Sequence, residues 1–244
     1  MNSTSISERE NLVMKEIKDR EMLYFSPKDI SRFLNMEKRN VYQVLSGMES
    51  KGLIHRIESG RYILEEDYKS KDVYELASNL IDSSYLGFLS SLHFHGMINQ
   101  VPRKIQIAST RRKGNMEIQG SEIHFVKIGE NDFYGYENYD RIVVSDPEKT
   151  VIDCLRLPDK AGDFSNIIDI DWKKLDARKM TKYAEKTGSS SVVSRLGVIF
   201  ERKGINSSIS NLKDMVKHYS KFDPRGEEKN PNSEWKLYEN REIE

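Results

Sequence analysis

The dipeptide Ser26-Pro27 constrains the fold of this 244-residue chain more than any other local feature. A serine hydroxyl caps the N–H groups at a helix start, and proline is tolerated at the first helical position because that N–H has no partner. A helix is therefore predicted over Pro27–Leu34, and Asn35-Met36 leaves only a tight turn after it. By helical spacing, its inward residues are Ile30, Phe33 and Leu34.

Two further helices are predicted, one on each side of this segment. The first covers Glu8–Arg20 and is capped by Ser5 or Ser7, and the other covers Glu37–Lys51 with Gly52 at its C-cap. The apolar faces carry Leu12, Val13 and Ile17 in the first helix and Val41, Val44, Leu45 and Met48 in the last.

A β-hairpin is predicted after the third helix. Two apolar runs, residues 53–57 and 61–64, stand on either side of Glu58-Ser59-Gly60, which has the composition of a turn. Two helices joined by a tight turn form a helix-turn-helix, and the hairpin adds a wing. The order of these elements predicts a winged helix-turn-helix over residues 1–66.

A winged helix places the N-terminal part of its third helix in the major groove of DNA. The outward residues there are Lys38, Arg39, Asn40, Tyr42, Gln43 and Ser46. Arg39 can bond guanine O6 and N7, and Asn40 or Gln43 can bond adenine in the same bidentate way. Arg56 and Arg61 in the hairpin suit phosphate or minor-groove contacts. We therefore expect binding to double-stranded DNA, with a protein-interaction module as the open alternative.

Charge supports this expectation only locally. Lysine plus arginine number 39 in the whole chain, and so do aspartate plus glutamate. Residues 38–61, in contrast, hold five basic and two acidic residues. The positive charge is thus concentrated on the elements expected to face DNA.

The rest of the chain, residues 67–244, is predicted to be a mixed α+β domain with a partly antiparallel sheet. A short polar linker is expected where it begins, over residues 66–72. Helices are expected over Val73–Ile81 and Tyr85–His95, from Ser145-Asp146-Pro147 onward, and over residues 173–186, 190–203 and 209–219. Strands are expected over Lys104–Ala108, Glu117–Ile118, Ile123–Val126 and Ile142–Val144.

Several runs resemble the AbiEi antitoxin family. They are YLGFLSSLHFHGMINQVPRKIQIASTRRK (Tyr85–Lys113), IHFVK (Ile123–Lys127), VSDPEKTVID (Val144–Asp153), DPRG (Asp223–Gly226) and WKLYEN (Trp235–Asn240). The third is similar to that family's TPE(R/K)ALLD helix. With the predicted winged helix in front, the shared order covers most of the chain.

The resemblance implies an antitoxin of a bicistronic toxin–antitoxin system. Members of that family repress their own operon through the winged helix, and their C-terminal domain counteracts a nucleotidyltransferase toxin. We accordingly expect an operator with an inverted repeat, a homodimer on DNA, and a toxin partner engaged directly or indirectly. Family members often carry a longer basic run than the Arg111-Arg112-Lys113 found here.

Residues 102–115 also stand out without the family. They contain Arg103, Lys104, Arg111, Arg112 and Lys113 and no acidic residue. Such a patch can meet nucleic-acid phosphates or an acidic protein surface. A solvated basic loop is the competing interpretation.

The sequence contains no pattern of residues typical of a catalytic or metal-binding site. Cys154 is the only cysteine and is expected to be buried in a helix. His93 and His95 are two residues apart, so a helix points their side chains to different faces. A metal ion bound by both histidines, with His124 nearby in sequence, is therefore not expected. One of the two is expected to form a hydrogen bond with a carbonyl oxygen at the helix end. Asp146 is explained as an N-cap. We predict no enzyme and no cofactor.

The N-terminus has no apolar signal segment, and no run approaches the ~20 residues of a membrane span. These patterns, with the single cysteine, favour a cytoplasmic protein without a membrane partner. One alternative function stays open: a ligand-responsive winged-helix transcription factor unrelated to any toxin.

Overall fold

The computed structural model describes residues 5–206 and 208–243 and divides into two compact units. The first unit comprises the described residues up to Leu80 together with Glu117–Ser121. The second comprises Ile81–Met116 and the chain from Glu122 onward. Residues 67–80, placed by the sequence in the second domain, thus group with the first unit.

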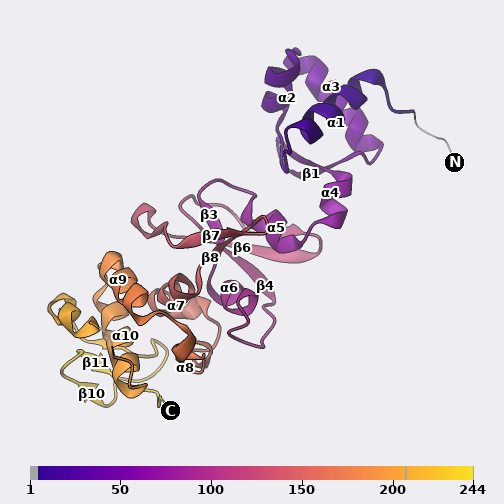
Figure 1. Cartoon of the computed structure of the whole chain (residues 1–244). Coiled ribbons are helices and arrows are strands. Elements are labelled where there is room, and N and C mark those ends of the chain that lie inside the picture. The colour runs from indigo at the N-terminus through magenta and orange to yellow at the C-terminus, as the bar shows by residue number, and fades with distance from the viewer. Residues whose placement is uncertain (1–4, 207, 244) are drawn as a thin grey trace. The chain divides into compact units, whose positions relative to one another are not determined.

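Three helices and a hairpin build the first unit in the predicted order (Figure 1). The helices are α1 (Glu8–Asp19), α2 (Pro27–Leu34) and α3 (Lys38–Ser50). Strands β1 (Ile54–Glu58) and β2 (Arg61–Leu64) pair antiparallel. The element predictions for residues 8–64 are therefore confirmed within one or two residues.

The predicted helix caps are present in the first unit. Ser7 and Ser26 each form a capping box, in which the hydroxyl accepts an N–H and an acidic side chain three residues on accepts the N–H of the serine. Gly52 has a φ of 66° and Gly60 a φ of 74°, both in the left-handed region that glycine adopts without strain. These residues end α3 and turn the hairpin.

One face of each helix contributes to the core of this unit. Its buried residues are Val13, Ile17, Phe25, Ile30, Val41, Leu45, Met48, Ile54, Tyr62 and Leu64. Leu12, predicted to lie on the apolar face of α1, is half-exposed instead. Val13 and Ile17 are one turn apart and fix the inward face, which leaves Leu12 pointing about 100° away from Val13.

A helix stands where a polar linker was expected. Helix α4 (Glu65–Ser70) follows β2 directly, and α5 (Val73–Ser78) begins after the N-cap Asp72. The ring of Tyr68 on α4 stacks on His55 of β1 with centroids 3.8 Å apart. Glu66 also pairs with Lys18 Nζ at 2.7 Å. The composition of residues 66–72 concealed this helix because it is held by an aromatic contact and ion pairs to distant segments and not by an apolar stripe.

The second unit is built on a mixed sheet. Its strands are β3 (Ser84–Leu86), β4 (Lys104–Ser109), β6 (Ser121–Lys127), β7 (Tyr136–Tyr139) and β8 (Ile142–Ser145), in the order β6-β4-β3-β8-β7. β3 pairs antiparallel with β4 and parallel with β8, β4 pairs parallel with β6, and β7 pairs antiparallel with β8. Strand β5 (Met116–Ile118) falls largely in the first unit. The α+β class and the partly antiparallel sheet are confirmed.

Two strands of this sheet were not predicted. The predicted helix Tyr85–His95 is wrong in its first part, because β3 comes first and α6 (Phe88–Phe94) begins only after Gly87. All of β3 is buried, and periodicity does not distinguish a short buried strand from a buried helix. Strand β7 is exposed along its whole length, so it lacks the alternation that marks a half-buried strand.

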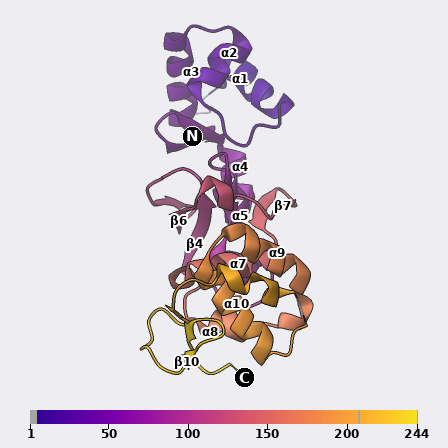
Figure 2. The same ribbon diagram turned by 90° about the vertical axis from the view of Figure 1, so that its left-hand side faces the viewer.

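The part of the second unit that follows β8 is mainly helical. They are α7 (Pro147–Arg156), α8 (Ser165–Ile168), α9 (Ala177–Thr187) and α10 (Ser190–Arg202), and α7, α9 and α10 contact one another (Figure 2). Short 3-10 turns occur at Glu130–Asp132, Pro158–Lys160, Trp172–Lys174 and Ile209–Met215. The helix expected over 173–186 therefore begins only at Ala177, and the helix expected over 209–219 is a 3-10 helix that ends at Met215.

A small sheet near the C-terminus was also missed. Strands β9 (Ser220–Lys221), β11 (Leu237–Tyr238) and β10 (Pro231–Asn232) pair in the order β10-β11-β9. A Cβ at Gly197 of α10 would lie 2.5 Å from the ring of Trp235, so glycine is required for this close approach. No helix in the described part of the chain is long and apolar enough to cross a membrane.

Candidate nucleic-acid interface

Helix α3 separates its residues sharply between core and solvent. Val41, Leu45 and Met48 are at most 1% exposed and hold the helix against α1 and α2. Arg39, Gln43 and Ser46 are exposed on the opposite side, at the spacing of a single stripe. The core contacts thereby orient these three side chains toward solvent.

The other predicted base-reading residues lie on the flanks of this stripe. Lys38 and Tyr42 are exposed, the tyrosine by 55%, whereas Asn40 is only half-exposed. Among the described residues, neither Lys38 nor Arg39 has an ion-pair partner, and the first turn of α3 contains no acidic residue. The start of α3 therefore presents two cations without an ion-pair partner, next to the exposed N-cap residue Glu37.

The two arginines of the hairpin differ in their surroundings. Arg56 is exposed and stands opposite Tyr62 in the β1–β2 register, within the strand and not at the turn. Arg61 is half-buried, with its Nε 3.8 Å from a Glu58 carboxylate oxygen and its guanidinium 5.8 Å from the ring of Tyr24. Arg56 is therefore the more available of the two for a phosphate.

An ion pair ties the end of α3 to the start of α1. Lys51 Nζ donates to Glu10 Oε2 at 2.7 Å, and Glu10 also accepts the N–H of Ser7. The hydrogen bond from Lys51 is the main cause that lowers the pKa of the Glu10 carboxyl below its ordinary value near 4.5. A Cβ at Gly47 would lie 3.1 Å from Glu10 Oε1, so α3 approaches this carboxylate closely. This contact fixes the orientation of α3.

The basic patch predicted over residues 102–115 does not lie in one place. Strand β4 separates Arg103 and Lys104 from the run Arg111–Lys113, which begins beyond its other end. At about 3.3 Å per residue, Lys104 and Ser109 at the two ends of β4 are ~16 Å apart. The chain then turns back, because Asn115 Nδ2 lies 3.3 Å and Lys104 Nζ 3.2 Å from the same atom, His124 Nε2. Lys104 Nζ also donates to Glu122 Oε1 at 3.2 Å, so part of its charge is compensated.

The parallel pairing of β4 with β6 adds a lysine to the second part. Ser109 at the end of β4 stands opposite Lys127 at the end of β6. Sequence reasoning missed Lys127 and its neighbour Phe125 as members of this cluster. Their spacing of two residues places both on one face of a strand, but only the register with β4 shows where that face lies.

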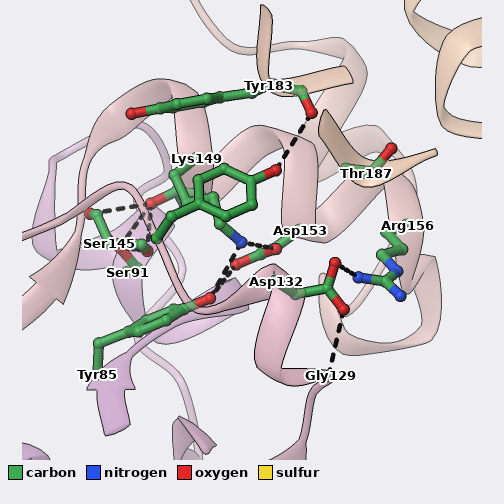
Figure 3. A network of polar contacts seen from close by, with 12 residues as sticks. Tyr85, Ser91, Gly129, Asp132, Ser145, Lys149, Asp153, Arg156, Tyr183 and Thr187 are labelled. Atoms are coloured by element: carbon green, nitrogen blue, oxygen red, sulfur yellow. Dashed lines mark hydrogen bonds and ion pairs between the residues drawn. The ribbon is translucent and has the colours of Figure 1, made fainter. Parts of the chain in front are cut away.

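A buried ion pair occupies the interior of the second unit (Figure 3). Lys149 and Asp153, one turn apart on α7, are 1% and 3% exposed and are joined directly. Tyr85 Oη donates to Asp153 Oδ2 at 2.7 Å, and Lys149 Nζ lies 4.7 Å from the centroid of the Tyr134 ring. Burial raises the pKa of the Asp153 carboxyl, although the Lys149 ammonium opposes the shift.

Hydroxyl groups continue this network toward α6. The Thr150 Oγ1 atom lies 2.7 Å from both Ser91 Oγ and Ser145 Oγ. His95 Nε2 lies 2.7 Å from the carbonyl oxygen of Ser145, which confirms the expected histidine–carbonyl contact at a helix end. Ser91, Ser145 and Thr150 are fully buried, and their hydroxyl groups join α6, β8 and α7.

The remaining acidic residues near α7 have structural partners. Asp146 caps α7 as predicted, accepting the N–H of Lys149 at 2.8 Å, and also accepts the hydroxyl of Tyr183 at 2.7 Å. Glu148 accepts the N–H of Asp176 at 3.0 Å. Cys154 is fully buried, as expected, and burial raises the pKa of its thiol. The described residues hold no group of three histidine, cysteine or acidic side chains placed to bind a metal ion.

Comparison with known proteins identifies a fold and no family. No protein-family model matches the chain, and no curated protein matches it. Among solved structures, the chain is similar to the RV2827C protein from Mycobacterium tuberculosis, with a TM-score of 0.56 and 11% sequence identity. The similarity covers 96% of this chain and 92% of that protein. At this identity the likeness establishes a shared α+β fold and nothing about activity.

Proposed function

We propose that the protein is a DNA-binding transcriptional autorepressor and the antitoxin of a bicistronic system whose toxin is a nucleotidyltransferase. The first unit is its winged helix-turn-helix, with α2 and α3 as the helix pair and β1–β2 as the wing. The observation that carries the proposal is the outward face of α3. It combines Arg39 and Gln43 with unpaired positive charge, on a helix whose opposite face is locked into a core.

The residue types on α3 suit direct reading of base edges. Arg39 is the best placed for guanine, because its fork of N–H donors matches the O6 and N7 acceptors. Gln43, one turn further on, suits adenine. Lys38 and Arg56 would hold the duplex by its phosphates, which positions the helix without selecting a sequence.

Two copies are expected on one operator. A single α3 can read only a short half-site, and two copies on an inverted repeat double the contacts with DNA. Where the two copies are joined as a dimer, the second half-site is bound at a high effective concentration. We therefore expect an inverted repeat upstream of the gene, with half-sites about one helical turn apart or a multiple of it.

The antitoxin part of the proposal rests on the resemblance of the second unit to AbiEi antitoxins. The similar runs include Val144–Asp153, which forms β8 and the capped start of α7, and Tyr85–Lys113, which forms β3, α6 and β4. In this proposal the second unit counteracts the toxin, and the first unit controls the amount of both proteins.

Two experiments test the two halves of the proposal. A mobility-shift assay should show tighter binding to the DNA upstream of the gene than to a scrambled duplex of equal length and composition. Equal affinities at physiological salt would contradict specific repression. The proposal expects a nucleotidyltransferase toxin to be encoded beside the gene. In cells that express that toxin, co-expression of this protein should rescue growth, and Arg39→Ala should still rescue it from a plasmid promoter. Continued growth arrest despite normal levels of this protein would contradict the antitoxin role.

A further inference from the structure

A hollow of about 440 Å³ lies on the second unit beyond the ends of β4 and β6. Its lining residues are Arg112, Lys113, Gly114, Phe125 and Lys127. Three of the five carry positive charge, one is aromatic, and none is acidic. Its lining contains no residue of α3 or of the buried network around Lys149.

The fold brings these residues together in a defined way. Lys127 is placed by the parallel register of β6 with β4, and its Nζ donates to the carbonyl oxygen of Thr110. The N–H of Arg111 donates to Ser109 Oγ at 3.0 Å, which shapes the turn that leaves β4. The turn therefore delivers Arg112 and Lys113 to the end of β6.

One of the cations lies over the aromatic ring. Lys113 Nζ lies 5.7 Å from the centroid of the half-buried Phe125 ring, within the range of a cation–π interaction. Among the described residues, no carboxylate lies within ion-pair distance of Arg112 or Lys127. At the other end of the same strands, Glu122 compensates Lys104. Within the described residues, Arg112 and Lys127 thus have no ion-pair partner.

We propose that this hollow binds a nucleotide unit, with its base against Phe125 and its phosphate at Arg112 and Lys127. An aromatic side chain can stack on any base, and adjacent cations can bind the phosphate. Proteins that bind single-stranded nucleic acid combine these two groups. A free nucleotide and single-stranded nucleic acid share this chemistry. Duplex DNA does not, because its base faces are already stacked.

The test uses the full-length protein and two probes, ATP and a 12-nucleotide oligothymidylate, each titrated by calorimetry. Phe125→Leu keeps apolar volume and removes the ring, and it should weaken binding by about 10-fold or more. Lys127→Gln should weaken binding and reduce the salt dependence of oligonucleotide binding by about 0.7 in log–log slope. Lys104→Gln removes the same charge at the other end of β4 and should change neither the affinity for the probes nor the salt dependence.

The two probes separate the sources of the ligand. Binding of ATP indicates a free nucleotide, and binding of the oligonucleotide alone indicates a single strand. Binding of neither probe overturns the proposal, and so does oligonucleotide binding that survives Phe125→Leu but is lost in Arg39→Ala. Loss on charge removal with no effect of Phe125→Leu also overturns it, because the site is then only an electrostatic patch. The operator shift should persist in Phe125→Leu, so failure of this proposal is distinguishable from failure of the repressor proposal.

Discussion

Helices α3 and α7 both carry basic side chains, but they use them in opposite ways. On α3, Lys38 and Arg39 point to solvent and have no acidic partner among the described residues. On α7, Lys149 is fully buried and paired with Asp153 one turn away, under the rings of Tyr85 and Tyr134. A charge that the fold leaves unpaired at the surface costs little and is available to a ligand. A charge that the fold buries must be paired, and its partner becomes essential to stability.

The difference separates two kinds of variant. Changes on the outer face of α3 should alter DNA binding and leave the fold intact. Changes in the buried network of α7 should destabilise the second unit and leave operator recognition intact wherever both units are folded.

The largest expected effect follows removal of the buried ammonium. Lys149→Met leaves Asp153 buried, with the Tyr85 hydroxyl as its remaining hydrogen-bond partner within the described residues. Breaking a buried pair in this way costs about 3–5 kcal/mol. Thermal or urea unfolding of the second unit measures the loss. The matched control is Lys182→Met on α9, where the lysine is exposed and the expected change is below about 0.5 kcal/mol. Equal stability of the two variants would mean that α7 does not depend on its ion pair.

A smaller effect is expected where α3 is tied to α1. Glu10→Gln removes the acceptor charge for Lys51 and should destabilise the first unit by about 1–2 kcal/mol near neutral pH. The folded protein lowers the pKa of Glu10, so the carboxylate contributes stability above about pH 4.5, and this contribution is lost as the pH falls through the lowered value. Unfolding curves of the native protein and the variant should therefore converge below about pH 4.5. Glu49→Gln, an exposed residue of α3, is the control, and a pH-independent difference would refute the role of the ion pair.

The smallest expected effect concerns the wing. Arg61→Ala should weaken binding to all duplexes alike and lower the log–log salt slope by about one, as for a single phosphate contact. Its contact with Glu58 already compensates part of its charge, so the loss should be smaller than for Arg56→Ala. Mobility shifts at several salt concentrations measure both. A loss of preference for the operator in Arg61→Ala would show that the wing reads bases.

The first unit was predictable because its signals are local. Ser26-Pro27, Gly52 and the 3.6-residue spacing of Val41, Leu45 and Met48 fix helix ends and faces within a few residues of sequence. The stacking of Tyr68 on His55 that stabilises α4 joins segments 13 residues apart, and no local pattern indicates it.

The second unit was predictable only in outline because its strands are defined by distant partners. β3 pairs with β4 and β8, about 20 and 60 residues away in sequence, and it reads like the start of a helix. The basic patch over residues 102–115 was also predicted only in part. Arg103 and Lys104 stand at one end of β4 and Arg111 follows the other end. The pairing of β6 with β4 then adds Lys127 beside Ser109, which the local sequence does not indicate.

The most direct test of the central claim is the effect of Arg39→Ala on the preference for the operator over a scrambled duplex. Arg9→Ala, which removes an exposed arginine from α1, is the matched control. If α3 reads bases, Arg39→Ala should weaken operator binding by about 1–3 kcal/mol, hardly change binding to the scrambled duplex, and relax the preference at one base position. Arg9→Ala should keep the full preference. An unchanged preference in Arg39→Ala, or an equal loss in both variants, would contradict the assignment of α3 as the recognition helix.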